Sequence, residues 1–249
     1  MPDLQLSSAA DLDLDALAAL FTAGYEDYYV PIHVERPALE FMASAFDLDL
    51  EASRVATSGG EGWIGGLGVV AASRRHGIGE TLMLATLDEA RTRGITEVRL
   101  EVIRENERAI PLYERLGFVT TRELEVWSLA GAAGRPDEIP AADAHDVTRT
   151  RRVLREPWQR DDGTIAQLGD ATGLRAGAGA AVVRVSNGRV SLLQAAGDDA
   201  ELRELVTAAR SLGDGLTVLN VPPDHPLAPV LADLGGRVDV TQYEMSLAL

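Results

Sequence analysis

Residues 67–118 decide the fold, and they read LGVVAASRRHGIGETLMLATLDEARTRGITEVRLEVIRENERAIPLYERLGF. The short apolar run at 67–70 predicts a strand, which breaks into a turn at 74–79 that contains arginine and glycine. Apolar residues then recur at helical spacing, a second apolar strand follows over 97–103, and a short helix ends before Gly117. This order predicts an α/β (α+β) protein with a mixed sheet.

The turn at 74–79 has the chemistry of an anion-binding loop. Glycines let the backbone approach an anion closely, and a helix start presents unpaired N–H groups and the positive end of the helix dipole. Arg74, Arg75 and His76 add cationic character that suits phosphate groups. The turn therefore predicts a phosphate site, although a tight strand-to-helix turn with exposed arginines has the same local pattern.

Two sequence blocks carry a family resemblance. Arg74, Gly77 and Gly79 fit the pattern Arg-x-x-Gly-x-Gly, which resembles the acetyl-CoA loop of the GCN5-related N-acetyltransferases, the GNAT superfamily. Downstream, the pattern Asn-x-x-Ala-x-x-x-Tyr-x-x-Leu-Gly-Phe at 106–118 is similar to the second signature block of that superfamily. Because both blocks occur in one chain in the family's order, the resemblance implies a GNAT fold.

The resemblance also implies a co-substrate and a set of contacts. Acetyl-CoA is the implied acyl donor, with no metal, and the implied catalytic residues are Tyr113 as general acid and Glu101 as general base. The spacing of twelve residues between them resembles the N-terminal-amine acetyltransferases of ribosomal proteins, although a strand glutamate can also be an orienting or solvated residue. The implied cofactor contacts are Val69, Val70, Arg74, Arg75, His76, Gly77, Ile78, Gly79, Glu80, Asn106, Ala109 and Tyr113.

Composition narrows the remaining classes of function. The 249 residues contain no cysteine, which excludes disulfides and thiol chemistry and makes the cytoplasm the default location. The four histidines are scattered without ligand spacing, so a metal site is not expected. A net charge of −16 argues against nucleic acid as a partner, and no apolar run approaches the length of a membrane span.

The distribution of charge indicates the acceptor. Residues 1–70 carry twelve acidic residues against two arginines, and in the GNAT fold this region borders the acceptor cleft. We therefore expect a cationic acceptor, either a small amine or a peptide N-terminus, although helix capping and solubility explain acidic residues as well. The candidate acceptor contacts are Tyr28, Tyr29, Asp47, Asp49 and Glu51.

The N-terminal region leaves one strand unplaced. The pattern predicts a short strand at 3–7, helices ending near Tyr25 and over 37–46, and strands near 54–56 and over 63–70. The GNAT family normally has a meander of three strands here, yet only a turn fits between Ala56 and Trp63. Either one strand is missing or a loop is absent.

The C-terminal half reads as a second, altered copy of the first. Residues 100–129 correspond to 219–247 with one gap, and residues 131–140 have the composition of a linker. Gly197-Asp198-Asp199 stands where the first copy has its basic loop, and Leu231 aligns with Tyr113. We expect a catalytic domain at 1–130 and a degenerate GNAT-like domain at 141–249, forming a pseudo-dimer within a monomer or homodimer.

The sequence thus favours an acetyl-CoA-dependent N-acetyltransferase in which a primary amine attacks the thioester directly. One alternative is a non-catalytic acyl-CoA-binding sensor or scaffold. The other is a mycothiol-synthase-like enzyme that acts on an amino sugar conjugate, although in that family the C-terminal half is the active one.

Overall fold

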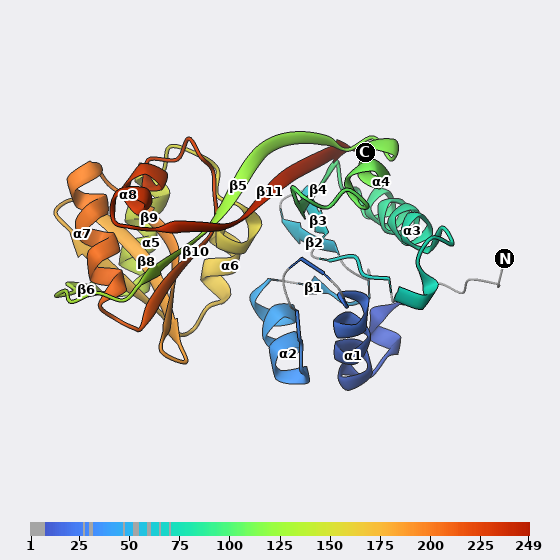
Figure 1. Ribbon diagram of the computed structural model, residues 1–249, viewed down its shortest axis with the longest axis horizontal. Helices are drawn as coiled ribbons and strands as arrows, with labels where there is room; N and C mark the ends of the chain where they lie inside the picture. The colour runs from blue at the N-terminus through green and yellow to red at the C-terminus, as the bar shows by residue number, and fades with distance from the viewer. Residues whose placement is uncertain are drawn as a thin grey trace. The chain divides into compact units, whose positions relative to one another are not determined.

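A computed structural model describes residues 8–26, 28–29, 32–46, 48–51, 55–58, 61–64, 66–69 and 71–249 (Figure 1). The chain divides into two units: unit 1 comprises residues 1–121 and 243–249, and unit 2 comprises residues 122–242. These limits differ from the expected domain boundary at residue 130. Strands β5 (Val119–Ala130) and β11 (Arg237–Ala248) each begin in one unit and end in the other.

The strands of unit 1 form a meander followed by a parallel pair. Their order is β1-β2-β3-β4-β11, with β1–β2 and β2–β3 antiparallel and β3–β4 parallel. The strand that the sequence left unplaced is β1, upstream of residue 54, and the expected strand at 3–7 lies outside the described residues. The strand expected over 63–70 is shorter, because β3 ends at Ile64. The bounds are β1 Leu48–Asp49, β2 Val55–Ser58, β3 Glu61–Ile64 and β4 Glu97–Ile103.

Strands β3 and β4 diverge at their carboxyl ends. Their pairing runs from Glu61 opposite Glu97 to Ile64 opposite Leu100. Strand β4 then continues to Ile103, whereas residues 66–69 are not part of a strand. Beyond Leu100, the edge of β4 that pairs with β3 therefore has no further strand pairing with residues 66–69.

The helices of unit 1 lie on both sides of this sheet (Figure 1). Helices α1 and α2 share one apolar cluster, and α3 and α4 pack with the buried residues of β4 in another. Asp13 caps α1 by accepting a hydrogen bond from the Ala16 N–H at 2.8 Å. The bounds are η1 Ala9–Asp11, α1 Leu14–Gly24, α2 Arg36–Ala45, η2 Ala71–Ser73, α3 Ile78–Thr92 and α4 Ile110–Arg115.

Unit 2 repeats the arrangement. Its strands run in the order β11-β5-β10-β9-β8-β7-β6, and β9 and β10 are parallel. Helices α7 and α8 contribute to one apolar cluster, and α5 and α6 contribute to another. The bounds are β6 Glu138–Ile139, α5 Ala141–Arg151, η3 Trp158–Arg160, α6 Asp162–Gln167, β7 Ala171–Ala176, β8 Gly179–Ser186, β9 Arg189–Ala196, α7 Asp199–Arg210, β10 Gly215–Val221 and α8 Leu227–Asp233.

The repeat is visible in the element limits themselves. Strands β10 and β11 begin and end 118 residues after β4 and β5. Gly117 and Gly235, which hold equivalent places before β5 and β11, have φ values of +95° and +83°. Because only glycine adopts this backbone region without strain, the same turn follows α4 and α8.

Residues 243–249 complete the sheet and the core of unit 1. Met245 is fully buried in the cluster that contains Tyr113, and Tyr243, Leu247 and Leu249 pack against the same cluster. The Leu249 N–H donates to the Thr96 carbonyl at 3.0 Å. Unit 1 therefore obtains its strand next to β4 from a segment that follows unit 2 in the sequence.

Candidate active site

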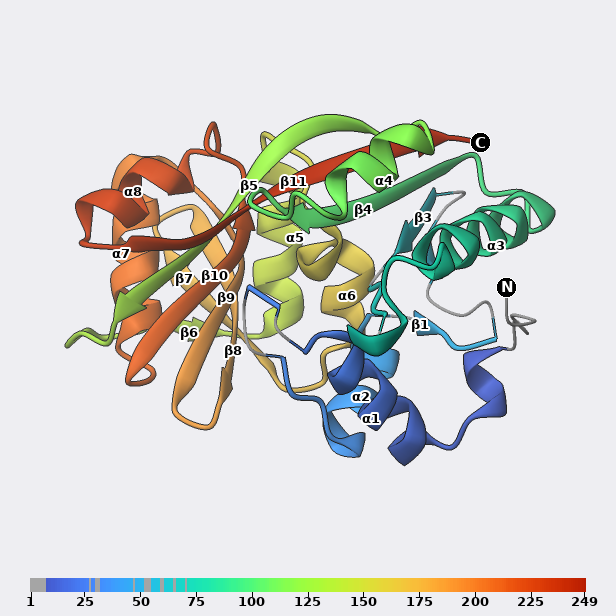
Figure 2. The ribbon, with the colours of Figure 1, turned by 45° about the vertical axis from the view of Figure 1, so that its right-hand side comes forward.

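The start of α3 has no side-chain cap among the described residues. Gly77 occupies the N-cap position with a φ of +78°, and no described side chain caps the helix. Arg75 also has a positive φ, +66°, and its side chain is exposed. The first N–H groups of α3 therefore lack intrahelical partners at the point where the loop that the sequence identified enters the helix. Figure 2 shows α3 and the chain that leads into it.

Arg74, expected to contact phosphate, makes its hydrogen bonds to backbone carbonyls instead. Its Nε donates to the Val69 carbonyl at 2.8 Å, and its Nη2 donates to the Glu26 carbonyl at 2.7 Å. A weaker contact joins Nη2 to the Gly24 carbonyl at 3.5 Å. The guanidinium thus connects the loop to the end of α1.

The end of α1 also packs directly on the segment that precedes the loop. A Cβ built on Gly24 would lie 3.0 Å from the Gly68 Cα, so the two backbones touch. A Cβ on Gly66 would lie 2.8 Å from the Tyr25 hydroxyl, which accepts a hydrogen bond from the Leu67 N–H at 3.1 Å. Sequence reasoning missed this contact, although the glycines at 65, 66 and 68 were its signal.

Tyr113 lies on α4 with 8% of its surface exposed. Its ring meets the Phe118 ring edge-on, with 6.0 Å between centroids. Burial raises the pKa of the phenol, and the nearby hydroxyls of Tyr25 and Tyr28 raise it further. Tyr113 is therefore a neutral phenol at physiological pH, and it can donate a proton to a stronger base.

Asn106 connects α4 to the aromatic segment after α1. Its Oδ1 accepts a hydrogen bond from the Ala109 N–H at 3.1 Å, and its side chain bonds to the Tyr28 hydroxyl. Burial raises the pKa of Tyr28, and the bond to Asn106 lowers it in part. The Tyr29 hydroxyl donates to the Glu105 carbonyl at 2.7 Å, so both tyrosines are attached to the loop before α4.

Glu101 is the first residue of β4 beyond the last pair with β3. Side chains alternate along a strand, and Leu100 and Val102 belong to the cluster that contains Tyr113. Glu101 therefore projects from the opposite face of the sheet, on the side of α1 and α2. Its Oε1 atom has no contact with solvent.

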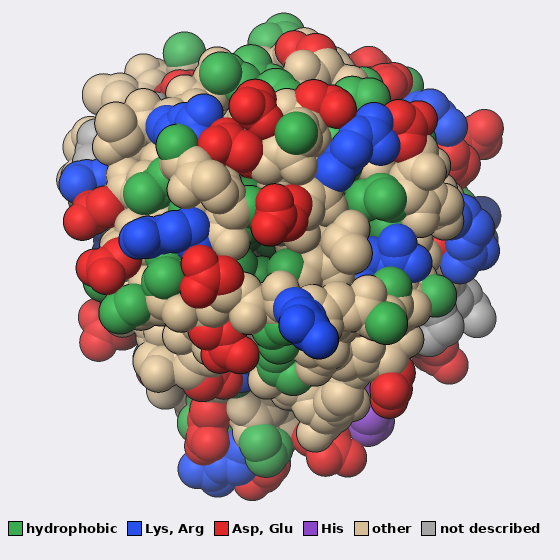
Figure 3. Space-filling view, turned by 90° about the vertical axis from the view of Figure 1, so that its left-hand side faces the viewer, with side chains coloured by type: hydrophobic (Ala, Val, Ile, Leu, Met, Phe, Trp, Pro, Cys, Tyr) green, Lys and Arg blue, Asp and Glu red, His purple; other side chains and the backbone are tan. Residues whose placement is uncertain are grey.

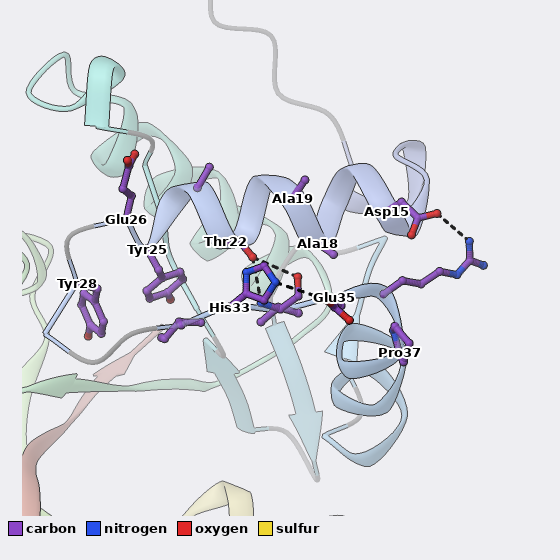
Figure 4. A pocket seen from close by; sticks show the side chains of 14 residues that line it. Asp15, Ala18, Ala19, Thr22, Tyr25, Glu26, Tyr28, His33, Glu35 and Pro37 are labelled. Atoms are coloured by element: carbon purple, nitrogen blue, oxygen red, sulfur yellow. Dashed lines mark hydrogen bonds and ion pairs between the residues drawn. The ribbon is translucent and has the colours of Figure 1, made fainter.

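A cavity of about 1060 Å³ opens beside α1 (Figure 4). Tyr25, Glu26 and Tyr28 lie at one end of it, and Asp15 and Glu35 lie toward the other. Three carboxylates and one guanidinium line the cavity, so the charge of its wall is net negative. The charged and titratable lining residues are Asp15, Tyr25, Glu26, Tyr28, His33, Glu35 and Arg36.

Comparisons with known proteins agree with this geometry. The model of the acetyltransferase (GNAT) family matches residues 38–118. N-alpha-acetyltransferase 30 of Schizosaccharomyces pombe is 40% identical over 70 residues, which are 28% of this chain and 47% of that relative. The match thus spans about half the length of the curated relative. Residues 38–118 thus match the GNAT family.

Solved GNAT structures share the fold over the whole chain. A GCN5-related N-acetyltransferase from Sphaerobacter thermophilus has a TM-score of 0.69 at 12% identity, covering 97% of this chain and 94% of its own. A tandem GNAT protein from the clavulanic acid biosynthesis pathway has a TM-score of 0.63 at 14% identity, covering 98% and 97%. The expected tandem GNAT fold is therefore confirmed.

In the unit 2 counterpart of the GNAT loop, two carboxylates cap the helix start. Asp198 caps α7 by accepting from the Glu201 N–H at 2.9 Å, and the Glu201 side chain accepts from the Asp198 N–H in return. The N–H groups that are open in α3 are therefore partly occupied in α7 by side chains, and both side chains are carboxylates.

In unit 2, the side chain and backbone of Arg160 bond to both central strands beyond the point where β9 and β10 stop pairing. Strands β9 and β10 pair only from Gly215 opposite Arg189 to Thr217 opposite Ser191. Beyond this point the Arg160 carbonyl accepts from the Gln194 Nε2 at 2.6 Å, and the Arg160 Nη2 donates to the Asn220 carbonyl at 3.3 Å. Arg160 is 1% exposed, so it joins the two strands from inside the unit.

Several expected site residues lie elsewhere or cannot be placed. Val70 and Asp47 lie outside the described residues, and the side chain of Asp49, in β1, is not described. Glu51 is exposed and does not line the cavity, whose carboxylates are Asp15, Glu26 and Glu35. The remaining loop positions lie together at the start of α3: His76, Gly77, Ile78, Gly79 and Glu80.

Two classes of site find no support in the described part of the chain. No group of three or more His, Cys, Asp or Glu side chains there could hold a metal ion, and no helix there has the length and apolar character to cross a membrane. On the face seen in Figure 3, acidic and arginine side chains are interspersed and do not form one basic surface.

Proposed function

We propose that the chain is an acetyl-CoA-dependent N-acetyltransferase with one active site, in unit 1. The observation that carries the proposal is the uncapped start of α3 together with buried Tyr113 and the divergence of β3 and β4. The uncapped helix start would bind a phosphate group, the divergence of the strands would hold an acyl arm, and Tyr113 would protonate a leaving thiolate.

The loop residues fit coenzyme A. The N–H groups at the start of α3 would bind pyrophosphate oxygens, and exposed Arg75 would add positive charge. Gly77 leaves room in the loop, because a Cβ there would have no atom within 4 Å. Bound acetyl-CoA supplies an activated acyl group.

The chemistry needs a base and an acid. Carboxylates near the acceptor favour its ammonium form, so the amine must lose a proton before its nitrogen attacks the carbonyl carbon. We assign Glu101 to accept that proton, directly or through water, because it projects toward the α1 side at the divergence of the strands. As the C–N bond forms and the C–S bond breaks, Tyr113 would donate its phenolic proton to the sulfur. The nitrogen would then release its surplus proton, through water, to the phenolate, which leaves a neutral amide and restores the phenol.

The cavity beside α1 supports a cationic acceptor. Its three carboxylates attract cations and repel anions, chiefly by raising the rate of capture, and Tyr25 and Tyr28 offer aromatic faces to a cation. A small amine and a peptide N-terminus share this chemistry. We propose that the acceptor is one of these two.

A panel of amines tests the function. We expect mass spectrometry to detect acetylated product from acetyl-CoA, with kcat/KM higher for a cationic amine than for a neutral amine of matched size. The preference should shrink with added salt, because screening acts over about 8–10 Å at physiological ionic strength. Binding of acetyl-CoA without any product would instead support a sensor, and a preference for the neutral amine would contradict the assigned acceptor.

A further inference from the structure

Arg74 joins the cofactor loop to the wall of the cavity. Its two short hydrogen bonds reach the Val69 carbonyl on the loop side and the Glu26 carbonyl on the α1 side. Glu26 lines the cavity, as does its neighbour Tyr25. One planar side chain therefore spans both parts of unit 1.

The segment that Arg74 holds is the end of α1. The last carbonyls of a helix lack intrahelical donors, and they carry the negative end of the helix dipole, so a guanidinium there is favourable. The helix is fixed at the same end by the contact between Gly24 and Gly68 and by the hydrogen bond from Leu67 to Tyr25. Displacement of residues 66–74 would therefore move the Tyr25 and Glu26 end of the cavity.

Two tyrosines at the same end of the cavity lie near the proposed acid. Tyr25 and Tyr28 stack edge-on, with 5.0 Å between ring centroids, and both act on the pKa of Tyr113. Farther along α1, the Thr22 hydroxyl accepts from the Val34 N–H at 3.0 Å and donates to the Val34 carbonyl at 3.2 Å. Hydrogen bonds therefore join α1 to the opposite wall of the cavity.

We propose that Arg74 is a positioning residue that couples the cofactor loop to the acceptor cavity, so that coenzyme A orders both. The inference rests on the proposed function, because it requires coenzyme A at the start of α3. Arginine is required rather than charge alone: Nε and Nη2 each serve a different carbonyl, whereas the single ammonium of lysine lacks this forked geometry. Phosphate binding belongs to Arg75 and the α3 N–H groups.

Hydrogen exchange with and without coenzyme A tests the coupling without knowledge of the acceptor. In the wild type, we expect coenzyme A to slow exchange of the amides at 77–82 and also of those at 22–26. In Arg74→Lys, we expect the protection at 77–82 to persist and the added protection at 22–26 to be lost. A purely structural role would raise exchange at 22–26 equally with and without coenzyme A.

Calorimetry with coenzyme A separates coupling from phosphate binding. The Kd should change less than about threefold in Arg74→Lys and rise about tenfold in Arg75→Gln, as expected for loss of one charged hydrogen bond. Arg91→Gln, which alters an exposed ion pair of α3 with Asp88, is the matched control and should leave both readouts unchanged.

The outcomes are distinguishable. If coenzyme A protects neither segment of the wild type, the proposed function fails and the coupling fails with it. If it protects 77–82 but not 22–26 in the wild type, or both segments in Arg74→Lys, only the coupling is wrong. A large rise of the Kd in Arg74→Lys with none in Arg75→Gln would make Arg74 a phosphate ligand and overturn the inference.

Discussion

At the scale of single residues, Tyr113 has the clearest expected effect. Tyr113→Phe removes the proton donor but keeps the ring that packs in the core, so we expect kcat to fall roughly ten- to a thousandfold with acetyl-CoA affinity nearly unchanged. Tyr243→Phe is the matched control, because Tyr243 packs against the same cluster outside the site. Normal turnover of Tyr113→Phe would mean that water protonates the thiolate.

His225 gives unit 2 a pH-dependent stability. Burial and the Arg160 charge lower its pKa to about 4, and its Nδ1 accepts a hydrogen bond from the Leu227 N–H at 3.0 Å. Between pH 4 and 6.5 the unfolded state therefore binds more protons than the folded state. The free energy of unfolding should accordingly fall by about 2 kcal/mol as the pH drops from 7 to 5.

His225→Asn isolates this effect, since asparagine can accept the same hydrogen bond but does not titrate. Denaturant unfolding of the wild type and the variant at pH 7 and pH 5 measures the difference in pH dependence. Buried Glu156 has a raised pKa and contributes with the opposite sign, so the comparison must be between variants. Equal pH dependence of the two proteins would refute the role of His225.

At the scale of elements, the two equivalent helix starts should differ in function. The α3 start is uncapped, whereas Asp198 and Glu201 cap α7, so we expect one molecule of acetyl-CoA per chain by calorimetry. Gly77→Asp with Gly79→Asp should abolish binding, because it places carboxylates at the proposed pyrophosphate site and strains the positive φ of Gly77.

A control for this pair of changes is Gly94→Asp. Gly94 also has a positive φ, +74°, with open space around its Cα, but it lies past the far end of α3. It should therefore cost similar backbone strain without loss of acetyl-CoA binding. Two sites per chain, or retained binding in the double variant, would contradict the assignment of a single site.

At the scale of the whole molecule, unit 1 should depend on residues 243–249. Met245→Ala leaves a cavity in a fully buried position and should cost about 2–5 kcal/mol. Deletion of 243–249 should prevent the folding of unit 1 and abolish acetyl-CoA binding. Hydrogen exchange resolved by segment would check that unit 2 keeps its protection, and an intact, binding-competent unit 1 after the deletion would show the segment to be dispensable.

Much of this fold could be predicted from residue types and their spacing over short stretches of the sequence. The glycine loop, Asn106 and Tyr113 identified the family because their roles need fixed residue types at fixed spacing, and the repeat was readable because its copies keep that spacing. The sequence did not predict that β5 and β11 each begin in one unit and end in the other. Alternation of apolar residues in these strands specifies which side chains are buried, but it does not specify which strand pairs with them. The prediction of 63–70 as a strand failed at Ile64 because periodicity does not encode where neighbouring strands diverge.

The residues that line the cavity were also only partly predictable from the sequence. Among the acidic residues before position 70, the expected acceptor contacts were Asp47, Asp49 and Glu51, whereas the carboxylates that line the cavity are Asp15, Glu26 and Glu35. Asp15 and Glu26 lie near Glu35 because hydrogen bonds between Thr22 and Val34 join α1 to the segment before α2. The contact between Gly24 and Gly68 likewise joins backbone segments far apart in sequence. A sequence indicates such close backbone contacts only by the presence of small residues, and it does not show which segment they contact.

The contribution of residues 243–249 to unit 1 also has a consequence for biosynthesis. Unit 1 cannot finish its sheet when residue 121 leaves the ribosome, because its remaining segment is translated only after residues 122–242. At about 5–20 residues per second, that delay is roughly ten seconds. During it the edge of β4 is unpaired and the apolar surface that Met245 covers is bare, so the nascent N-terminal half is the species on which a chaperone would act.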